Sequence, residues 1–266
     1  MKDAIRNWKI HVLVVILVVI AELIGIHSFK VVLLPMLYAL IIGALLGPKF
    51  VKAVNQKDMV DAGSLIGVTL MLLMARYGTL VGPNLPMILK TSPALILQEF
   101  GNLGTVLIGI PVAVLLGLKR ESIGAAHSVS REPNVALIGD VYGLDTPEGQ
   151  GVMGVYICGT VFGTIFYGLM ATVTAALNIF HPLALGMASG VGSASMMTAS
   201  VGSLSAMYPD IADKIQALGA ASNMLSGLDG LYMSLWMALP LSEWLYRRTY
   251  KIKYGEFPEK PKYKEV

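Results

Sequence analysis

Long apolar runs follow one another along almost the whole of this 266-residue chain, and they constrain its fold more than any other feature. Several of them approach or exceed the roughly 20 residues that a helix needs to cross a bilayer. The chain is 55% hydrophobic and 14% charged, whereas charged residues make up roughly 25% of an ordinary soluble domain. The sequence therefore predicts an all-α integral membrane protein with about eight transmembrane segments.

The apolar runs and the polar residues between them set the expected segments and domains. We expect a scaffold and dimerisation part at 1–90, a transport core at 91–245 and a basic cytoplasmic tail at 246–266. The first run has no convincing cleavage site after it, so we interpret it as a retained span and not a signal peptide. The expected segments are 10–26, 31–46, 61–88, 92–118, 122–142, 151–177, 184–205 and 215–241.

Basic residues are distributed unevenly between the expected loops. With eight crossings, 15 of the 20 Lys and Arg residues fall on one side, namely before the first span, after the second and fourth, and after residue 246. Because Lys and Arg concentrate in cytoplasmic loops, both termini are predicted to be cytoplasmic and the acidic loop 143–150 to be outside. A re-entrant hairpin at 122–142 or 184–205, in place of a crossing, remains an alternative.

Two of the eight segments, 122–142 and 184–205, are expected to be broken helices. Fifteen of the 22 residues in 184–205 are Gly, Ala, Ser or Thr, and Pro133 interrupts 122–142. Residues 123–130 and 185–192 share three identities at a constant offset of 62. Paired interrupted segments in the two halves of a chain indicate the binding site of a secondary transporter. A chance likeness between small-residue packing helices is the alternative.

The first break carries the residues that we expect to bind a substrate. In the sequence SREPN, an unwound segment would present Arg131, Glu132 and Asn134, with free backbone N–H groups, to an anion. Alternatively, Arg131 and Glu132 pair with each other near the membrane surface. Hydroxyl and amide groups near the second break are further substrate-binding candidates, with tight helix packing as the alternative: Ser189, Ser193, Ser195, Thr198 and Asn223.

Four titratable residues are candidates for proton or cation coupling. Asp229 lies within the last span, His127 next to the first break, Asp140 at the far end of that segment and Glu99 in the fourth span. Charged groups in a bilayer are costly and usually functional, and His titrates near neutral pH. Each has a structural alternative, such as an interhelical hydrogen bond or a solvated position.

Three stretches resemble the LrgB/CidB family of membrane proteins, which includes the plastid glycolate/glycerate transporter. They are AAHSVSREPNVAL at 125–137, ALGMASGVGSAS at 184–195 and GLDGL at 227–231. The chain departs from the family pattern where His127 replaces Lys, where Asp229 replaces Asn and where the second stretch lacks its His. The resemblance implies an all-helical transporter core with two crossing broken helices, as in a sister family of prokaryotic membrane proteins, and no substrate is carried over.

We therefore expect a secondary transporter in the cell membrane that moves a small anionic organic solute, such as a monocarboxylate or an amino-acid-like molecule, coupled to H⁺ or Na⁺. The alternatives are a holin-like pore and a partner-dependent membrane subunit. A homodimer is expected, with no nucleic-acid partner. The only cysteine is Cys158, and no catalytic or metal-binding motif is present, so neither enzyme activity nor a metal or cofactor is expected.

Overall fold

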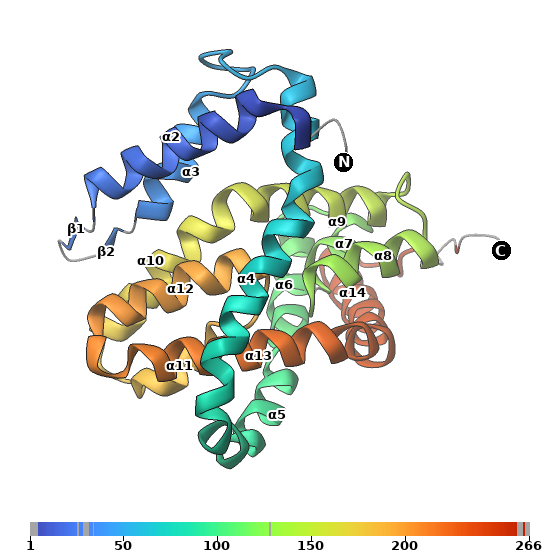
Figure 1. The fold of residues 1–266 in the computed structure, drawn as a ribbon. Coiled ribbons are helices and arrows are strands. Elements are labelled where there is room, and N and C mark those ends of the chain that lie inside the picture. The colour runs from blue at the N-terminus through green and yellow to red at the C-terminus, as the bar shows by residue number, and fades with distance from the viewer. Residues whose placement is uncertain are drawn as a thin grey trace.

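The computed structural model describes residues 5–25, 27–28, 32–33, 35–127, 129–259 and 263. In this part of the chain the fold is all-α, as predicted, apart from a two-residue antiparallel ladder between β1 (His27–Ser28) and β2 (Val32–Leu33). Figure 1 shows the arrangement of the helices. In chain order they are α2 (Trp8–Ile24), α3 (Pro35–Leu45), α4 (Gln56–Lys90), α5 (Ser92–Gly101), α6 (Gly104–Leu115), α7 (Glu121–Ala126), α8 (Arg131–Val141), α9 (Pro147–Cys158), the π-helix η1 (Gly159–Gly163), α10 (Thr164–Ala176), α11 (Pro182–Ala188), α12 (Ala194–Met207), the 3₁₀-helix η2 (Pro209–Ile211), α13 (Ala212–Met233), the π-helix η3 (Ser234–Ala238) and α14 (Leu239–Tyr254).

Helices α2 and α3 pack against each other and lie beside the start of α4 (Figure 1). Lys9 and Asn7, at the start of α2, both donate hydrogen bonds to Asp58, at 2.9 and 3.0 Å. Asp58 also forms a reciprocal capping box with Asn55, which begins α4. The hydrogen bonds from Asn7, Lys9 and Asn55 lower the pKa of Asp58 to about 2. The N-terminal end of the chain and the loop before α4 therefore lie together, as the charge distribution predicted.

One helical stretch in the described part of the chain, Ser92–Leu115, is long and apolar enough to cross a membrane by length and composition. It comprises α5 and α6, which meet at a bend at Asn102 and Leu103. The prediction of about eight such segments is therefore confirmed only at the level of an all-α fold.

The segment 122–142 does not run from one end of the fold to the other. Arg120, just before α7, and Tyr142, just after α8, both hydrogen-bond to Glu243 on α14. Helices α7 and α8, with the break between Ala126 and Arg131, therefore form a hairpin that we call hairpin 1. Of the two alternatives left open by the sequence, a crossing or a hairpin, this geometry favours the hairpin, because a contact 123 residues away along the chain holds both of its ends together. The acidic loop 143–150 consequently lies at the Arg120 end of the fold, because Glu148 also binds Arg120.

The segment 184–205 also turns back. Leu183 at the start of α11 and Met207 at the end of α12 pack against one core cluster, together with Ala175 and Ile215. Helices α11 and α12, with the break at 189–193, form a second hairpin, hairpin 2 (Figure 1). Helices α9, η1 and α10 run between the two hairpins, so hairpin 2 enters the fold from the end opposite to hairpin 1. The crossing broken helices that the family resemblance implied are replaced by two opposed hairpins.

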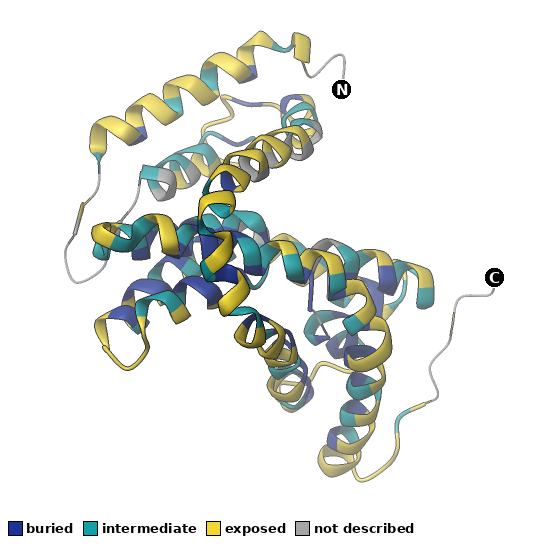
Figure 2. Cartoon of the chain, turned by 60° about the horizontal axis from the view of Figure 1, so that its bottom comes forward, coloured by how far each residue is buried: buried dark blue, intermediate teal, exposed yellow. Residues whose placement is uncertain are grey.

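Helix α13 lies at the centre of the core and packs against α4, α11 and α12. Figure 2 shows that burial is concentrated around these central helices, whereas α2 is largely exposed. The helix continues through η3 into α14 as far as Tyr254, so part of the expected tail at 246–266 is helical. Lys253 of α14 donates to the carbonyl oxygens of Val114 and Leu115 at the end of α6.

Candidate functional site

The two helix breaks meet at one cavity of about 280 Å³. Val129 and Asn134 line it from hairpin 1, and Val191, Gly192 and Met196 line it from hairpin 2. The two hairpins enter from opposite ends of the fold, so the cavity lies where their tips converge. The pairing of the two broken segments, which rested on a weak sequence echo, is therefore a feature of the three-dimensional structure.

Two helices begin at this cavity. Helix α8 starts after Ser130, whose backbone is extended, and α12 starts after Ser193, whose hydroxyl accepts a hydrogen bond from the Met196 N–H. The first N–H groups of a helix have no partner within the helix and carry partial positive charge. Helix starts of this kind bind anions. Gly192 has a φ of +100°, a conformation that glycine adopts without strain and that turns the chain into α12.

Both breaks pack closely against α13. A Cβ atom at Gly190 would lie 2.4 Å from the Ser222 side chain, and one at Gly230 would lie 2.4 Å from the Ser130 side chain. Asn223, also on α13, donates hydrogen bonds from Nδ2 to the carbonyl oxygens of Gly190 at 2.9 Å and of Gly192 at 3.2 Å. Glycine is needed at Gly190 and Gly230 because the breaks approach α13 too closely for any side chain.

The side chains that form the wall between the hairpins were not among the predicted site residues. Gly159 and Gly163, at the two ends of the π-helix η1, line the cavity, as do Tyr156 and Tyr167 on either side of it. A single π-helical turn within an α-helix often marks a functional site. The sequence signal that could have identified this wall is the spacing of Gly159 and Gly163, a small-xxx-small pattern that permits close approach of another helix. The side chain that approaches is Met196.

A polar cluster adjoins the cavity at the bend between α5 and α6. Asn102 lines the cavity and donates from Nδ2 to Oε2 of Glu99 at 2.8 Å. Ser226 on α13 donates to Oε1 of Glu99 at 2.7 Å. The Asp229 carboxyl group on α13 lies close enough to that of Glu99 for the two to interact electrostatically, and its Oδ1 atom has no hydrogen-bond partner among the described residues. The structure thus brings together Glu99 and Asp229, two of the four predicted coupling residues. The side chain of Asn102 lies between Glu99 and the cavity.

The other two coupling candidates lie away from the cavity lining that the structure describes. Asp140 is exposed near the end of α8 and is absent from the described cavity lining, which fits the alternative of a solvated position. His127 is fully buried, and its Nδ1 atom hydrogen-bonds to the Ile123 carbonyl oxygen at 3.1 Å. Its Nε2 atom has no hydrogen-bond partner among the described residues. This bond to the preceding helical turn fits the structural alternative for His127.

The predicted substrate-binding residues divide into three groups. Asn134 is buried, lines the cavity, and has an Oδ1 atom without a hydrogen-bond partner in the described part of the chain. Arg131 and Glu132 begin α8 next to the cavity, but their side chains lie outside what the structure describes. The remaining predicted residues act within or between helices, at positions outside the described cavity lining: Ser189, Ser193, Ser195, Thr198 and Asn223.

Hydrogen bonds explain why these five side chains do not face the cavity. Ser189 donates to Leu185 O and Thr198 donates to Ala194 O, both bonds to the preceding helical turn. The hydroxyls of Ser193 and Ser195 bond to each other at 3.0 Å. Asn223 directs its amide at the backbone of the second break. For the serine and threonine residues these bonds fit the alternative of tight helix packing, because local carbonyl groups compete for short hydroxyl side chains; their role as ligands stays a prediction.

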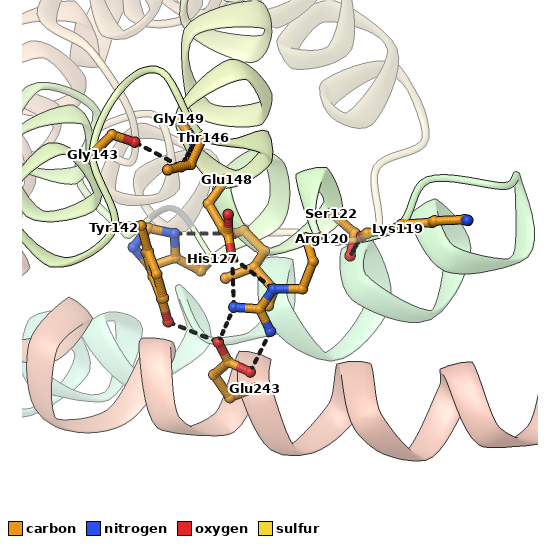
Figure 3. Close-up of polar contacts among 11 residues, drawn as sticks. Lys119, Arg120, Ser122, His127, Tyr142, Gly143, Thr146, Glu148, Gly149 and Glu243 are labelled. Carbon is orange, nitrogen blue, oxygen red and sulfur yellow. Dashed lines mark hydrogen bonds and ion pairs between the residues drawn. The ribbon is translucent and has the colours of Figure 1, made fainter. Parts of the chain in front are cut away.

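A charged cluster holds together the start of α7 and the end of α8, the two ends of hairpin 1 that lie away from the cavity. Arg120 donates to Oε1 of Glu148 at 2.6 Å and to both carboxylate oxygens of Glu243 at 2.6 and 2.9 Å. Figure 3 shows the guanidinium between the two carboxylates, with the Tyr142 hydroxyl reaching Glu243 from hairpin 1. Arginine suits this position because its planar fork binds a carboxylate through two parallel hydrogen bonds.

No curated protein and no solved structure matches this chain. The resemblance to the LrgB/CidB family therefore stays a prediction. One family model, described as a protein of unknown function (DUF3100), matches residues 15–248. Because that match covers most of the 266 residues, the chain belongs to the DUF3100 family.

Proposed function

We propose that this protein is a secondary transporter of a small organic anion, such as a monocarboxylate or an amino-acid-like molecule, in the cell membrane. The observation that carries the proposal is the convergence of two opposed re-entrant hairpins on one cavity. Secondary transporters place substrates at discontinuous helices near the middle of the bilayer. A cavity of about 280 Å³ suits a solute at or below the small end of the usual ligand range.

The distribution of apolar side chains supports a position in the bilayer. Helix α2 exposes large apolar residues on most sides and buries only Ile10 and Ala21 among its described residues. A helix that is hydrophobic all round is buried in a core or surrounded by lipid. In the proposed topology α2, α3, α4, α5–α6, α9–α10 and α13 cross the membrane, and the hairpins enter from opposite faces.

The distribution of basic residues orients this topology. Lys119 and Arg120 before hairpin 1 lie at the same end of the fold as α14, which carries Arg247, Arg248 and Lys253. Because positive charge concentrates on the cytoplasmic side, this end and both termini are cytoplasmic in the proposal. With two re-entrant hairpins the loop 143–150 is cytoplasmic too.

The preference for an anion rests on the starts of α8 and α12, which both contribute to the cavity. No charged side chain lines the cavity among the residues that the structure describes, so these helix starts are the source of positive potential there. Asn134 adds an amide oxygen without a partner among the described residues, which can accept a hydrogen bond from a hydroxyl or ammonium group elsewhere on the solute.

Proton coupling is proposed for Glu99 and Asp229. Two carboxylates that lie close together repel each other, and binding one proton relieves that repulsion; Asn102 joins Glu99 to the cavity wall. The alternative coupling ion, Na⁺, requires a cage of oxygen ligands, and the carbonyl oxygens of Gly190 and Gly192 at the second break are occupied by Asn223.

The test is uptake and counterflow in liposomes that contain the purified protein. Labelled acetate, lactate, alanine and glutamate are supplied outside, with and without an inward proton gradient. We expect saturable uptake of at least one of them, faster when the same compound is loaded inside. Flux that rises without saturation would instead indicate a pore, and activity that requires a second protein would indicate a partner-dependent subunit.

A glycine pair gives matched variants for this assay. Gly192→Ala places a side chain at a φ of +100°, next to the cavity, so uptake should fall sharply because the second break is strained. Gly227→Ala is the control, because a Cβ atom there meets nothing within 4 Å. Equal transport by the two variants would argue against the second break as part of the substrate site.

A further inference from the structure

Asn223 makes two hydrogen bonds that cross from α13 to the second break. Its Nδ2 atom donates to the carbonyl oxygens of Gly190 and Gly192. An amide NH₂ group has two hydrogens, so these two bonds use its whole donor capacity. The residue is also absent from the described cavity lining. Its side chain is therefore committed to the backbone of the break and does not serve as a substrate ligand.

The bond to Gly192 fixes the direction of the peptide unit that starts α12. In a trans peptide the C=O of one residue and the N–H of the next point in opposite directions. Because the Gly192 carbonyl points to Asn223, the Ser193 N–H points away from α13. Gly192 and Met196 line the cavity, and the first N–H groups of α12 have no acceptor within the helix.

Close packing sets the register of this contact. A Cβ atom at Gly190 would lie 2.4 Å from Ser222 and 2.5 Å from the Gly219 carbonyl oxygen. The break therefore sits directly on α13, and Asn223 is the residue after Ser222. A shift of α13 along its axis by even one residue, about 1.5 Å, would separate the amide from both carbonyl groups.

We infer that Asn223 is a positioning residue, which holds the Gly190–Gly192 backbone against α13 so that the N–H groups at the start of α12 face the cavity and bind the substrate anion. The consequence for anion binding rests on the proposed function, whereas the consequence for the break itself does not. Asn223 thus acts on the substrate through the backbone, in place of the direct contact that the sequence suggested.

The experiment compares amide hydrogen exchange in peptides covering 189–197 of the purified protein. In Asn223→Ala we expect exchange there to be roughly tenfold faster or more, since two hydrogen bonds of ordinary net strength are lost. The matched control is Gln216→Ala on the same helix, which removes an amide that donates to Ser205 near the other end of α12. Unchanged exchange in Asn223→Ala would overturn the inference, and so would an equal rise in Gln216→Ala.

A second variant tests the hydrogen bond itself and covers the case in which Asn223→Ala does not fold. Asn223→Asp has the same shape, but its ionised carboxylate cannot donate and repels the two carbonyl groups. When protonated, it donates one hydrogen bond. We therefore expect its exchange, taken as a ratio to wild type at each pH, to be fast at neutral pH and to slow on acidification.

Glu99 on α5 and Asp229 on α13 are the titratable groups near this contact. Because they titrate in both proteins, the ratio of exchange rates in Asn223→Asp and wild type cancels their effect on exchange. A ratio for Asn223→Asp that does not change with pH would contradict the proposed hydrogen bond.

Sodium acetate serves as the anion probe, with sodium chloride as the ionic control. We expect acetate to slow exchange at 189–197 in wild type and to have no effect in Asn223→Ala. Equal protection by acetate in both proteins would refute the claim that Asn223 directs the N–H groups. If acetate protects neither protein while Asn223→Ala still exchanges faster, Asn223 positions the break as inferred and the proposed anion site fails.

Discussion

Replacing Arg120 by Ala should be among the most damaging substitutions outside the cavity. The Arg120 side chain is 16% exposed, and its partners Glu148 and Glu243 are 5% and 17% exposed. The change leaves two mostly buried carboxylates without a cation. Removing one partner of a buried ion pair costs about 3–5 kcal/mol, and partial exposure places this case at about 3 kcal/mol. At about 2–4 °C for each kcal/mol in a chain of this size, the melting temperature should fall by about 6–12 °C.

The assay is thermal unfolding of the purified protein in detergent, followed by circular dichroism. Lys119→Ala is the control, because Lys119 is the adjacent basic residue and is exposed. Arg120→Lys keeps the charge but loses the two-bond fork to Glu243, so it should recover only part of the lost stability. Melting temperatures of Arg120→Ala and Lys119→Ala within about 2 °C of each other, less than 1 kcal/mol on that scale, would refute the assigned network and the closure of hairpin 1.

Three further predictions concern packing, pH and topology. Gly124→Ala should destabilise the protein by about 1–3 kcal/mol or more, because its Cβ atom would lie 1.8 Å from the carbonyl oxygen of residue 148. The control is Gly154→Ala, whose Cβ atom meets nothing within 4 Å and which should be neutral or stabilising in the same thermal-unfolding measurement. The pKa of Asp58 is lowered from 3.8 to about 2, so its ionised form contributes stability that is complete above pH 4 and lost as the pH falls to 2. Asp58→Asn should lose this acid sensitivity. A difference in stability between wild type and Asp58→Asn that stays the same from pH 5 to pH 2 would contradict this prediction. In a cysteine-free background, Asp145→Cys should react with an impermeant maleimide only from the cytoplasmic side and Asn178→Cys only from the opposite side; labelling of Asp145→Cys from outside would restore the eight-crossing topology.

The position of the second helix break was predictable from the sequence because its cause is local. Glycine and serine at 189–193 disfavour a continuous helix, and the structure interrupts the helix there. The expectation of an unwound SREPN segment at 130–134 was wrong, because α8 begins at Arg131 and Pro133 lies in its first turn, where proline is tolerated. The closure of each segment into a hairpin was not predictable, because it depends on contacts distant in sequence. Arg120 and Glu243 are 123 residues apart, and no local pattern indicates that they pair.

The same distinction explains the assignment of individual site residues. Asn134, which the sequence suggested as a substrate ligand, does line the cavity, because a polar side chain next to a helix break within an apolar segment has few other roles; its role as a ligand stays a prediction. Ser189 and Thr198 were not, since a hydroxyl one turn after a carbonyl group bonds to it in place of a ligand. Asn102 was passed over as a site residue, because its importance comes from its place between Glu99 and the cavity.

Helix α13 gives the proposed coupling a physical route. It contacts the second break at Gly219, Ser222 and Asn223 and the first break at Gly230. Between these contacts lie Ser226, which donates a hydrogen bond to Glu99, and Asp229, whose carboxyl group neighbours that of Glu99. The contacts at Asn223 and Gly230 are seven residues apart, or about 10 Å along the helix axis, so a single rigid element carries both breaks and one half of the carboxyl pair. In the proposed mechanism, gain or loss of a proton by this carboxyl pair changes the contact between α5 and α13, and a displacement of α13 moves both breaks at the cavity together.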